Sequence, residues 1–178
     1  MSQPILKSST RLRRRLLLGL VPAAWLRSGH ALPVPTLQFP RDLGSHPDFG
    51  TEWWYVTGWL SLPDGAPLGF QTTFFRVRTG VGDDSPSAFA PRQLILAHAA
   101  IADPRLKRLR HDERSARAGF GRAGFETGRS GVWVGDWRFA QVGDAYRAEV
   151  NAADFAYVLE CVPDGPPLLN GVGGFSAK

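Results

Sequence analysis

Three adjacent aromatic residues, Trp53, Trp54 and Tyr55, constrain the fold of this chain more than any other feature. Successive side chains of a β-strand point to opposite faces of the sheet, so a strand through this run carries large rings on both faces. A strand with one face in water would not accommodate them. We therefore expect this strand either to be covered on both sides or to line, with one face, a cavity for something apolar.

Strand-forming residues recur through most of the remaining chain, between Gly and Pro residues that punctuate them. We expect strands at residues 52–62, 67–78, 92–102, 131–142 and 153–162. Pro63-Asp64-Gly65 predicts a hairpin turn between the first two. The pattern predicts an all-β domain, either an antiparallel barrel or a closed sandwich, and small closed barrels have room for one apolar ligand.

Two segments are predicted to be loops. Residues 80–87 are polar and rich in Gly, and residues 104–122 carry seven basic side chains against only Asp112 and Glu113. The basic segment could meet anionic lipid headgroups or a partner. The alternative is a solvated hairpin whose arginines pair with acids elsewhere. The near-neutral charge of the chain outside its first residues favours this second interpretation.

Residues 1–31 have the composition of an export signal. They hold six basic residues and no acid, an apolar run at 16–26, and small residues before Ala31. Arg13-Arg14-Arg15 also fits a twin-arginine signal. The net charge of +5 arises here, since the rest of the chain holds 15 basic and 16 acidic residues and gives no sign of nucleic-acid binding. We expect residues 32–178 to be exported, to the periplasm or outside the cell, without a transmembrane segment.

Candidate catalytic residues precede the aromatic run: His46, Asp48 and Glu52. A carboxylic acid kept neutral by burial can donate a proton, and aromatic faces can stabilise a developing cation. Simpler roles compete with catalysis. Asp48 follows Pro47, where an Asp commonly bonds its own backbone in a turn. Glu52 could form an ion pair with Arg76 across two neighbouring strands.

The other chemically active residues are scattered. Asp136, near Trp133 and Trp137, forms a second and weaker set of acid and aromatics. His98 is in register with Leu94 and Leu96 on an apolar strand face, which favours a core histidine over a pocket residue. Cys161, the single cysteine, is expected to be a buried thiol on such a face. The four histidines lack metal-ligand spacing, and we expect neither a metal site nor a cofactor.

Several motifs resemble the AttH-like family of secreted lipocalin-like proteins, which includes carotenoid 1,2-hydratases. They lie at residues 39–58, 69–76, 97–103, 116–121 and 166–169, and the resemblance covers about residues 37–178. It implies a lipocalin-like fold that binds a carotenoid or lipid without a cofactor. In complete members it implies the addition of water to a terminal double bond. The residues expected to contact such a ligand are Trp53, Trp54, Tyr55, Trp59, Phe74, Arg76 and His98.

Length separates this chain from the family it resembles. Family members are usually about twice as long, and the acid thought to protonate the polyene lies in their second half. Residues 32–178 are therefore expected to be the first of two lipocalin-like domains, inactive alone and completed by a second domain or by another copy. The alternatives are a non-enzymatic carrier of a lipophilic molecule and an inactive fragment.

Overall fold

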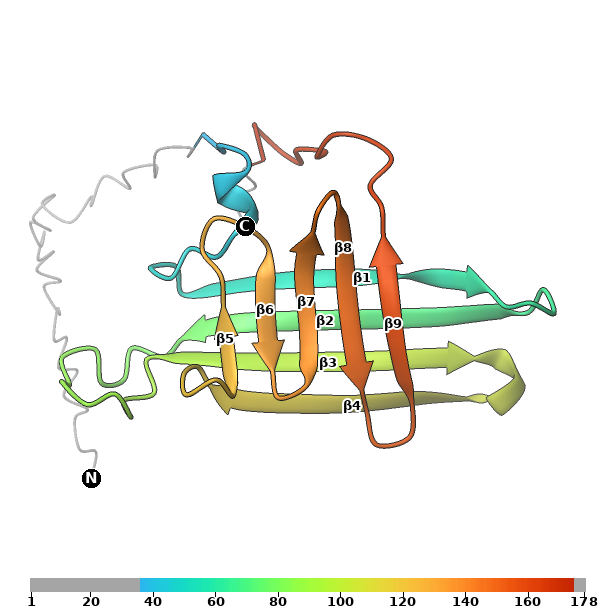
Figure 1. Ribbon diagram of the computed structural model, residues 1–178, viewed down its shortest axis with the longest axis horizontal. Coiled ribbons are helices and arrows are strands. Elements are labelled where there is room, and N and C mark those ends of the chain that lie inside the picture. Colours follow the sequence, from blue (N-terminus) through green and yellow to red (C-terminus); the bar gives the residue numbers. More distant parts are fainter. Residues whose placement is uncertain (1–35, 175–178) are drawn as a thin grey trace, which may run out of the picture. The chain divides into compact units, whose positions relative to one another are not determined.

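The computed structural model describes residues 36–174, so the predicted signal peptide lies outside the described part. Strands make up most of this part, and its helical segments are two short 3-10 turns (Figure 1). In chain order the elements are η1 (Arg41–Leu43), β1 (Thr51–Ser61), β2 (Pro67–Arg78), β3 (Gln93–Asp103), η2 (Pro104–Leu106), β4 (Arg108–Arg117), β5 (Ala123–Phe125), β6 (Gly131–Val134), β7 (Trp137–Val142), β8 (Ala145–Asn151) and β9 (Ala156–Cys161).

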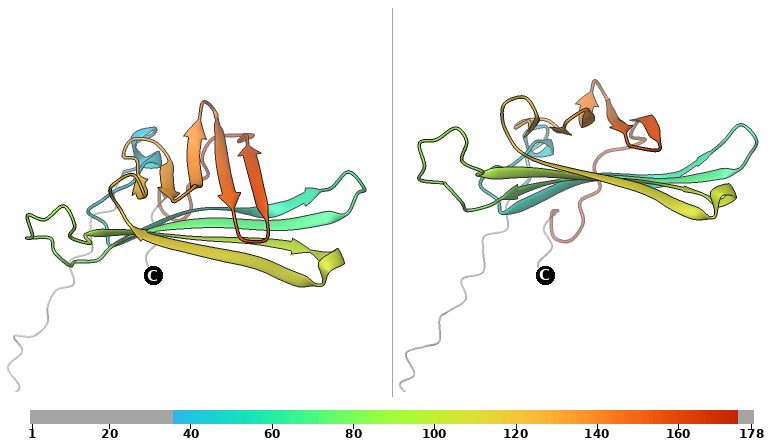
Figure 2. Two further views of the ribbon diagram at one scale, coloured as in Figure 1. Left: turned by 60° about the horizontal axis from the view of Figure 1, so that its bottom comes forward. Right: turned by 90° about the horizontal axis from the view of Figure 1, so that it is seen from below.

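The strands form two antiparallel sheets. The first sheet has the order β1-β2-β3-β4 and the second the order β5-β6-β7-β8-β9, so each strand pairs with its neighbour in the sequence. The strands of the second sheet run across those of the first (Figures 1 and 2). Among the described residues no strand of one sheet pairs with a strand of the other. The predicted all-β fold is confirmed, as a sandwich and not as a closed barrel.

The core lies between the two sheets. Phe74, Ile95 and Ala97 bury the inner face of the first sheet, and Val132 and Trp137 bury that of the second. A hydrogen bond of 2.6 Å joins the hydroxyl groups of Thr72 and Tyr157 across the sandwich. Burial raises the pKa of the Tyr157 hydroxyl, a shift that the bond from Thr72 opposes, so this hydroxyl stays protonated at neutral pH.

The prediction of a loop over residues 104–122 is wrong, because ten of these residues form β4. Its inner face carries Arg110, Asp112 and Arg114, which bind polar groups of the second sheet and its turns. An inner face made of ions lacks the apolar alternation by which a half-buried strand is recognised. The loop predicted at residues 80–87 is confirmed, as part of the connection between β2 and β3.

Two further differences concern the second sheet. The single strand predicted at 131–142 is two strands, separated by a turn at Gly135-Asp136 in which Gly135 takes a φ of 62°. Such a positive φ suits Gly and lets the chain reverse within two residues. β8 was missed entirely, although Tyr146, Ala148 and Val150 alternate with Arg147, Glu149 and Asn151 as in a half-buried strand.

The arginines of the basic segment divide into two groups. Four of them lie within 4.0 Å of a carboxylate: Arg105, Arg108, Arg110 and Arg114. For these the predicted pairing with acids is confirmed, although most of the segment is the strand β4 and not a solvated hairpin. Within residues 36–174, Arg117 and Arg122 have no such partner.

The outer face of β1 differs from expectation. Trp53, Tyr55 and Trp59 all lie on it, with 55%, 61% and 79% of their surface exposed. The strand is therefore not covered on both sides among the described residues. Its inner face, with Trp54 and Val56, packs against the core. Of the two arrangements expected for this strand, the one that remains is a strand with one face lining a cavity.

Neither of the short helical turns in the described part has the length or apolar character needed to cross a bilayer.

Candidate functional site

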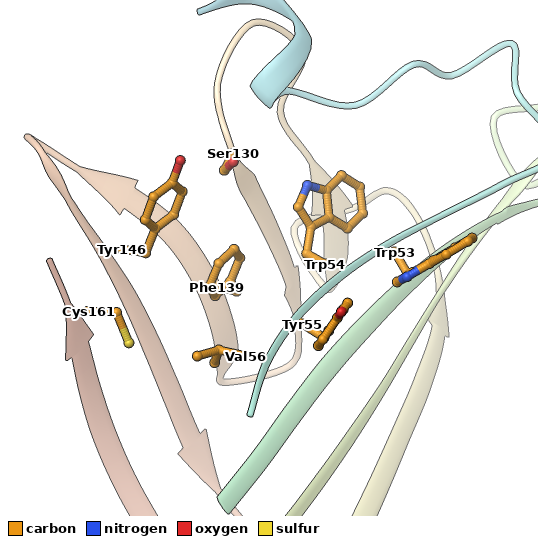
Figure 3. A pocket seen from close by; sticks show the side chains of 8 residues that line it. All are labelled: Trp53, Trp54, Tyr55, Val56, Ser130, Phe139, Tyr146 and Cys161. Atoms are coloured by element: carbon orange, nitrogen blue, oxygen red, sulfur yellow. The ribbon is translucent and has the colours of Figure 1, made fainter. Parts of the chain in front are cut away.

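An apolar cavity opens between the two sheets beside β1 (Figure 3). Its volume is about 390 Å³, within the usual range of small-molecule sites. Its lining residues come from β1, from the residue before β6 and from β7 to β9: Trp53, Trp54, Tyr55, Val56, Ser130, Phe139, Tyr146 and Cys161. We call it the apolar cavity.

β1 contributes four consecutive residues to this lining. The side chains of Trp54 and Val56 point into the apolar cavity, whereas the rings of Trp53 and Tyr55 lie on the other side of the strand (Figure 3). Because side chains alternate along a strand, Trp53 and Tyr55 line the cavity at the edge of β1 and not with their rings. Of the aromatic run, Trp54 alone presents its ring to a ligand there.

A second hollow of about 430 Å³ continues from the apolar cavity. The two share Trp53, Trp54 and Ser130. The remaining lining is more polar and comes from the chain before β1 and from its first residues: Asp42, Leu43, Gly44, His46, Thr51 and Glu52. We call it the polar hollow. Together they form one groove with an apolar end and a charged end.

Glu52 is the centre of the polar hollow. Its carboxylate accepts bonds from the Ser45 hydroxyl at 2.7 Å, from the His46 backbone N–H at 2.8 Å and from Arg76 Nε at 2.7 Å. Burial raises the pKa of this carboxyl, but the bonds from Ser45, Arg76 and His46 outweigh burial and hold its pKa below the ordinary value. Glu52 is therefore ionised at neutral pH.

Arg76 lies directly opposite Glu52 on β2, and their predicted cross-strand ion pair is confirmed. The Arg76 side chain is fully buried. Besides Glu52 it binds the Gln93 side chain at 2.7 Å and the carbonyl groups of residues 46, 47 and 49 at 2.9, 3.3 and 2.8 Å. One buried guanidinium thus fixes the turn that carries His46 to the inner face of the first sheet.

His46 lies between two carboxylates at the rim of the polar hollow. Its Nδ1 is 2.7 Å from Glu52 Oε1, and its Nε2 is 3.3 Å from Asp42 Oδ1. Its ring stacks on Phe49 with the centroids 5.2 Å apart. A hydrogen bond from Arg41 is the main cause that holds the pKa of the Asp42 carboxyl far below its ordinary value. Only an imidazole that carries two protons can donate to both carboxylates.

Close backbone contact positions this segment. A Cβ at Gly44 would lie 2.2 Å from the Gly128 nitrogen, so only glycine fits at residue 44. The next residue, Ser45, donates its N–H to the Glu126 carbonyl at 2.9 Å. The Ser130 hydroxyl donates to the Leu43 carbonyl at 2.8 Å. These contacts hold the residues before β1 against the turn that leads into β6. Both segments contribute residues to the lining of the polar hollow.

Of the three predicted catalytic residues, the structure brings His46 and Glu52 into contact but leaves Asp48 apart. Asp48 is exposed in the turn and belongs to the lining of neither hollow.

The hydrogen bond from Asn151 is the largest cause that lowers the pKa of Asp136, and Arg114 adds to it. Asp136 joins the β6–β7 turn to β4 and β8.

The remaining predicted ligand contacts are dispersed. Phe74 is buried in the core, and Trp59 projects into solvent. His98 does share a face with Leu94 and Leu96, but this is the outer face of the first sheet, so a core histidine is not what the structure has. The inner face of β3 carries Ile95, Ala97 and Ala99. Cys161 is half-buried and lines the apolar cavity.

Among the groove residues that sequence reasoning missed are Asp42, Ser130, Phe139 and Tyr146, and it also missed Ser45, which binds Glu52. Asp42 and Ser45 stand within the first motif, and their spacing from His46 was the available signal. Phe139 alternates with Trp137 on β7, which indicates an inner face. Ser130 carried no signal, since it precedes a strand. Tyr146 alternates with Ala148 and Val150, which indicates an inner face, but its strand was not predicted.

No group of three or more His, Cys, Asp or Glu side chains in the described part is arranged to hold a metal ion. The arrangement that is present can hold an elongated apolar molecule beside Trp54, and it can offer an imidazole–carboxylate pair to a polar group at its other end.

Comparisons with known proteins identify the family. An AttH-like family model matches residues 30–178. Among solved structures, a protein of Nitrosomonas europaea, whose 2.00 Å crystal structure carries AttH as a provisional name, is 47% identical with a TM-score of 0.71. The match covers 82% of this chain and 44% of that one, so the chain spans less than half of its relative's length. The comparison with curated proteins gives no match. The chain belongs to the AttH-like family.

Proposed function

We propose that this chain is a binding domain for a lipophilic molecule, a polyene or lipid, held in the apolar cavity. The observation that carries the proposal is the lining of that cavity. Trp54 and Val56 offer it ring and aliphatic surface from the first sheet, and Phe139, Tyr146 and Cys161 offer such surface from the second. Burial of apolar surface is the driving force that such a lining supplies.

The binding class follows from what lies at each end of the groove. No charged side chain of residues 36–174 lines the apolar cavity, whereas the polar hollow holds Asp42, His46 and Glu52. A long apolar chain fits the first, and a hydrogen-bonding end group would meet His46 in the second. We further propose that the protein acts after export, as its amino-terminal residues predict.

Addition of water to a double bond is proposed for the complete protein alone. Protonating a carbon atom requires a neutral acid, and both carboxyl groups of the polar hollow have lowered pKa values. This favours a carrier function for residues 36–174 and a proton donor outside them. Mass spectrometry of an acyclic carotenoid tests the idea: the full-length protein should add one water, and this chain should add none.

Binding can be tested by filling the cavity. We expect Cys161→Phe to weaken the binding of a fluorescent polyene fatty acid, cis-parinaric acid, by about tenfold or more, because the new ring takes up the volume that the ligand needs. The measurement is a titration followed by the fluorescence of the probe. Circular dichroism checks that the variant is folded.

Val158→Phe is the matched control. Val158 lies on the same strand, β9, but 56% of its surface is exposed. It adds a ring of the same size outside the cavity and should bind the probe as the parent chain does. Equal affinity of both folded variants and the parent would place the ligand elsewhere and overturn the proposal.

A further inference from the structure

Two exposed phenylalanines meet at one end of the first sheet. Phe89 comes from the connection between β2 and β3, and Phe120 from the turn between β4 and β5. They are 66% and 61% exposed, yet their rings stack with centroids 5.0 Å apart. The Arg117 guanidinium lies 5.4 Å from the centre of each ring, and it donates to the Phe89 carbonyl.

Phe120 is held in a conformation that its side chain disfavours. Its φ is 54°, in the left-handed region where a bulky residue is a genuine outlier. Its neighbours Gly119 and Gly121 also have positive φ angles, which glycine adopts without steric strain. The turn is closed by bonds from Gly119 to Ala123 at 2.8 Å and from Arg122 to Gly119 at 3.1 Å. The turn therefore places an aromatic ring at its exposed tip at a cost in backbone free energy.

The charges around these rings differ from those on the rest of the molecule. Of the thirteen arginines among residues 36–174, ten lie within 4.0 Å of a carboxylate. The three that do not are Arg92, Arg117 and Arg122, and all three belong to the two connections that carry the rings or directly adjoin them. Arg92 instead binds the carbonyl groups of Gly82 and Ser85 within its own loop.

Acids do not cancel this charge. The connection between β2 and β3 contains Asp83 and Asp84, of which Asp83 pairs with Arg78 at 2.8 Å. Arg78, Arg92, Arg117 and Arg122 therefore outnumber the two aspartates of this region. Val81 adds a third exposed apolar side chain to the same loop. We call Val81, Phe89, Phe120 and the arginines 92, 117 and 122 the loop patch.

We propose that the loop patch docks on a membrane surface that contains anionic lipids. Aromatic rings beside arginines that have no carboxylate partner in the described part suit the boundary between headgroups and acyl chains, where the rings lie among apolar atoms and the guanidinium groups meet phosphates. A protein partner fits less well, because a stable interface covers about 800 Å² on each side and the loop patch is confined to two loop tips. This proposal does not rest on the ligand proposed for the apolar cavity.

Vesicle sedimentation tests the docking directly. The full chain is mixed at low salt with vesicles of phosphatidylcholine, with and without phosphatidylglycerol. We expect binding to the mixed vesicles that weakens with added salt. Because every variant keeps the same basic residues 1–31, their contribution cancels when variants are compared.

Phe120→Gly is the decisive variant. Glycine accepts the positive φ, so the variant should unfold at the same temperature as the parent or higher, while vesicle binding falls about tenfold. Arg122→Gln should lower binding to the mixed vesicles and leave the weak binding to pure phosphatidylcholine unchanged. Trp59→Ala, which removes a more exposed ring at the opposite end of the sheet, is the matched control and should change nothing.

Two results would overturn the proposal. In one, Trp59→Ala lowers vesicle binding as much as Phe120→Gly, which would mean general adhesion of exposed rings. In the other, vesicle binding is unaffected by Phe120→Gly while self-association in light scattering is lost, which would make the loop patch a protein interface.

Discussion

Two carboxylate–arginine pairs in this molecule have the same chemistry and opposite surroundings. Glu52 and Arg76 are 13% and 0% exposed, whereas Asp136 and Arg114 are 51% and 32% exposed. Both arginines also lie over an aromatic ring, Arg76 over Phe125 and Arg114 over Trp137. In the sequence both acids stand beside tryptophans, so that signal could not separate them. Burial separates them, and it decides what each pair does.

The buried pair organises the groove, and breaking it should have the largest effect. We expect Arg76→Met to lower the free energy of unfolding by about 3–5 kcal/mol, because it leaves an ionised Glu52 and three carbonyl groups without their partner. Urea unfolding measures this change. Arg78→Met, two residues along β2 and exposed, should stay within about 0.5 kcal/mol of the parent. Similar losses for both variants would show that burial does not distinguish the pairs.

Acid titration should reveal the same pair with an intermediate effect. The pKa of Glu52 is lower in the folded chain than its ordinary value of 4.5, so its contribution to stability is complete above pH 4.5 and is lost as the pH falls through the folded pKa. Asp42, Asp103 and Asp136 share this direction. Glu52→Gln removes one of these titrations.

Urea midpoints of the parent and of Glu52→Gln, measured over a series of pH values, check this prediction. Below pH 4.5 the stability of the variant should fall less steeply than that of the parent. Parallel slopes would mean that Glu52 binds protons alike in the folded and unfolded chain, against the contacts described for it.

The exposed pair should give the smallest effect. We expect Asp136→Asn to cost at most about 1 kcal/mol, since water screens the pair and an amide can keep part of the bonding. Adding salt should reduce the difference from the parent further. A loss as large as that of Arg76→Met, or one that salt leaves unchanged, would contradict the comparison.

Much of the first sheet could be predicted from the sequence. β1, β2 and β3 lie within one residue of the predicted ranges, because each is rich in strand-forming residues and is bounded by Gly or Pro. The Glu52–Arg76 pair followed from the same register. β4 could not be predicted in this way, since three residues of its inner face, Arg110, Asp112 and Arg114, bind polar groups of the second sheet and its turns.

The candidate site was only partly visible. His46 and Glu52 stand within one motif and do meet. The sequence did not tell which of the neighbouring aromatic rings lies on the same face of β1 as Glu52. Alternation tells that Trp53 and Trp54 face opposite ways, but not which of them faces inward. His98 illustrates the same ambiguity, because Leu94 and Leu96 beside it line the outer face. Residues from the second sheet, such as Tyr146, enter the groove through tertiary packing alone.

The uncovered side of β1 also affects how the protein behaves in solution. Among the described residues β1 pairs only with β2, so its other edge has unpaired backbone groups, and Trp53, Tyr55 and Trp59 stand exposed beside them. A long edge strand with apolar side chains and no charge on its outer face favours pairing with further chains. The alternation that gives the apolar cavity its Trp54 therefore also gives the isolated chain a tendency to aggregate as its concentration rises.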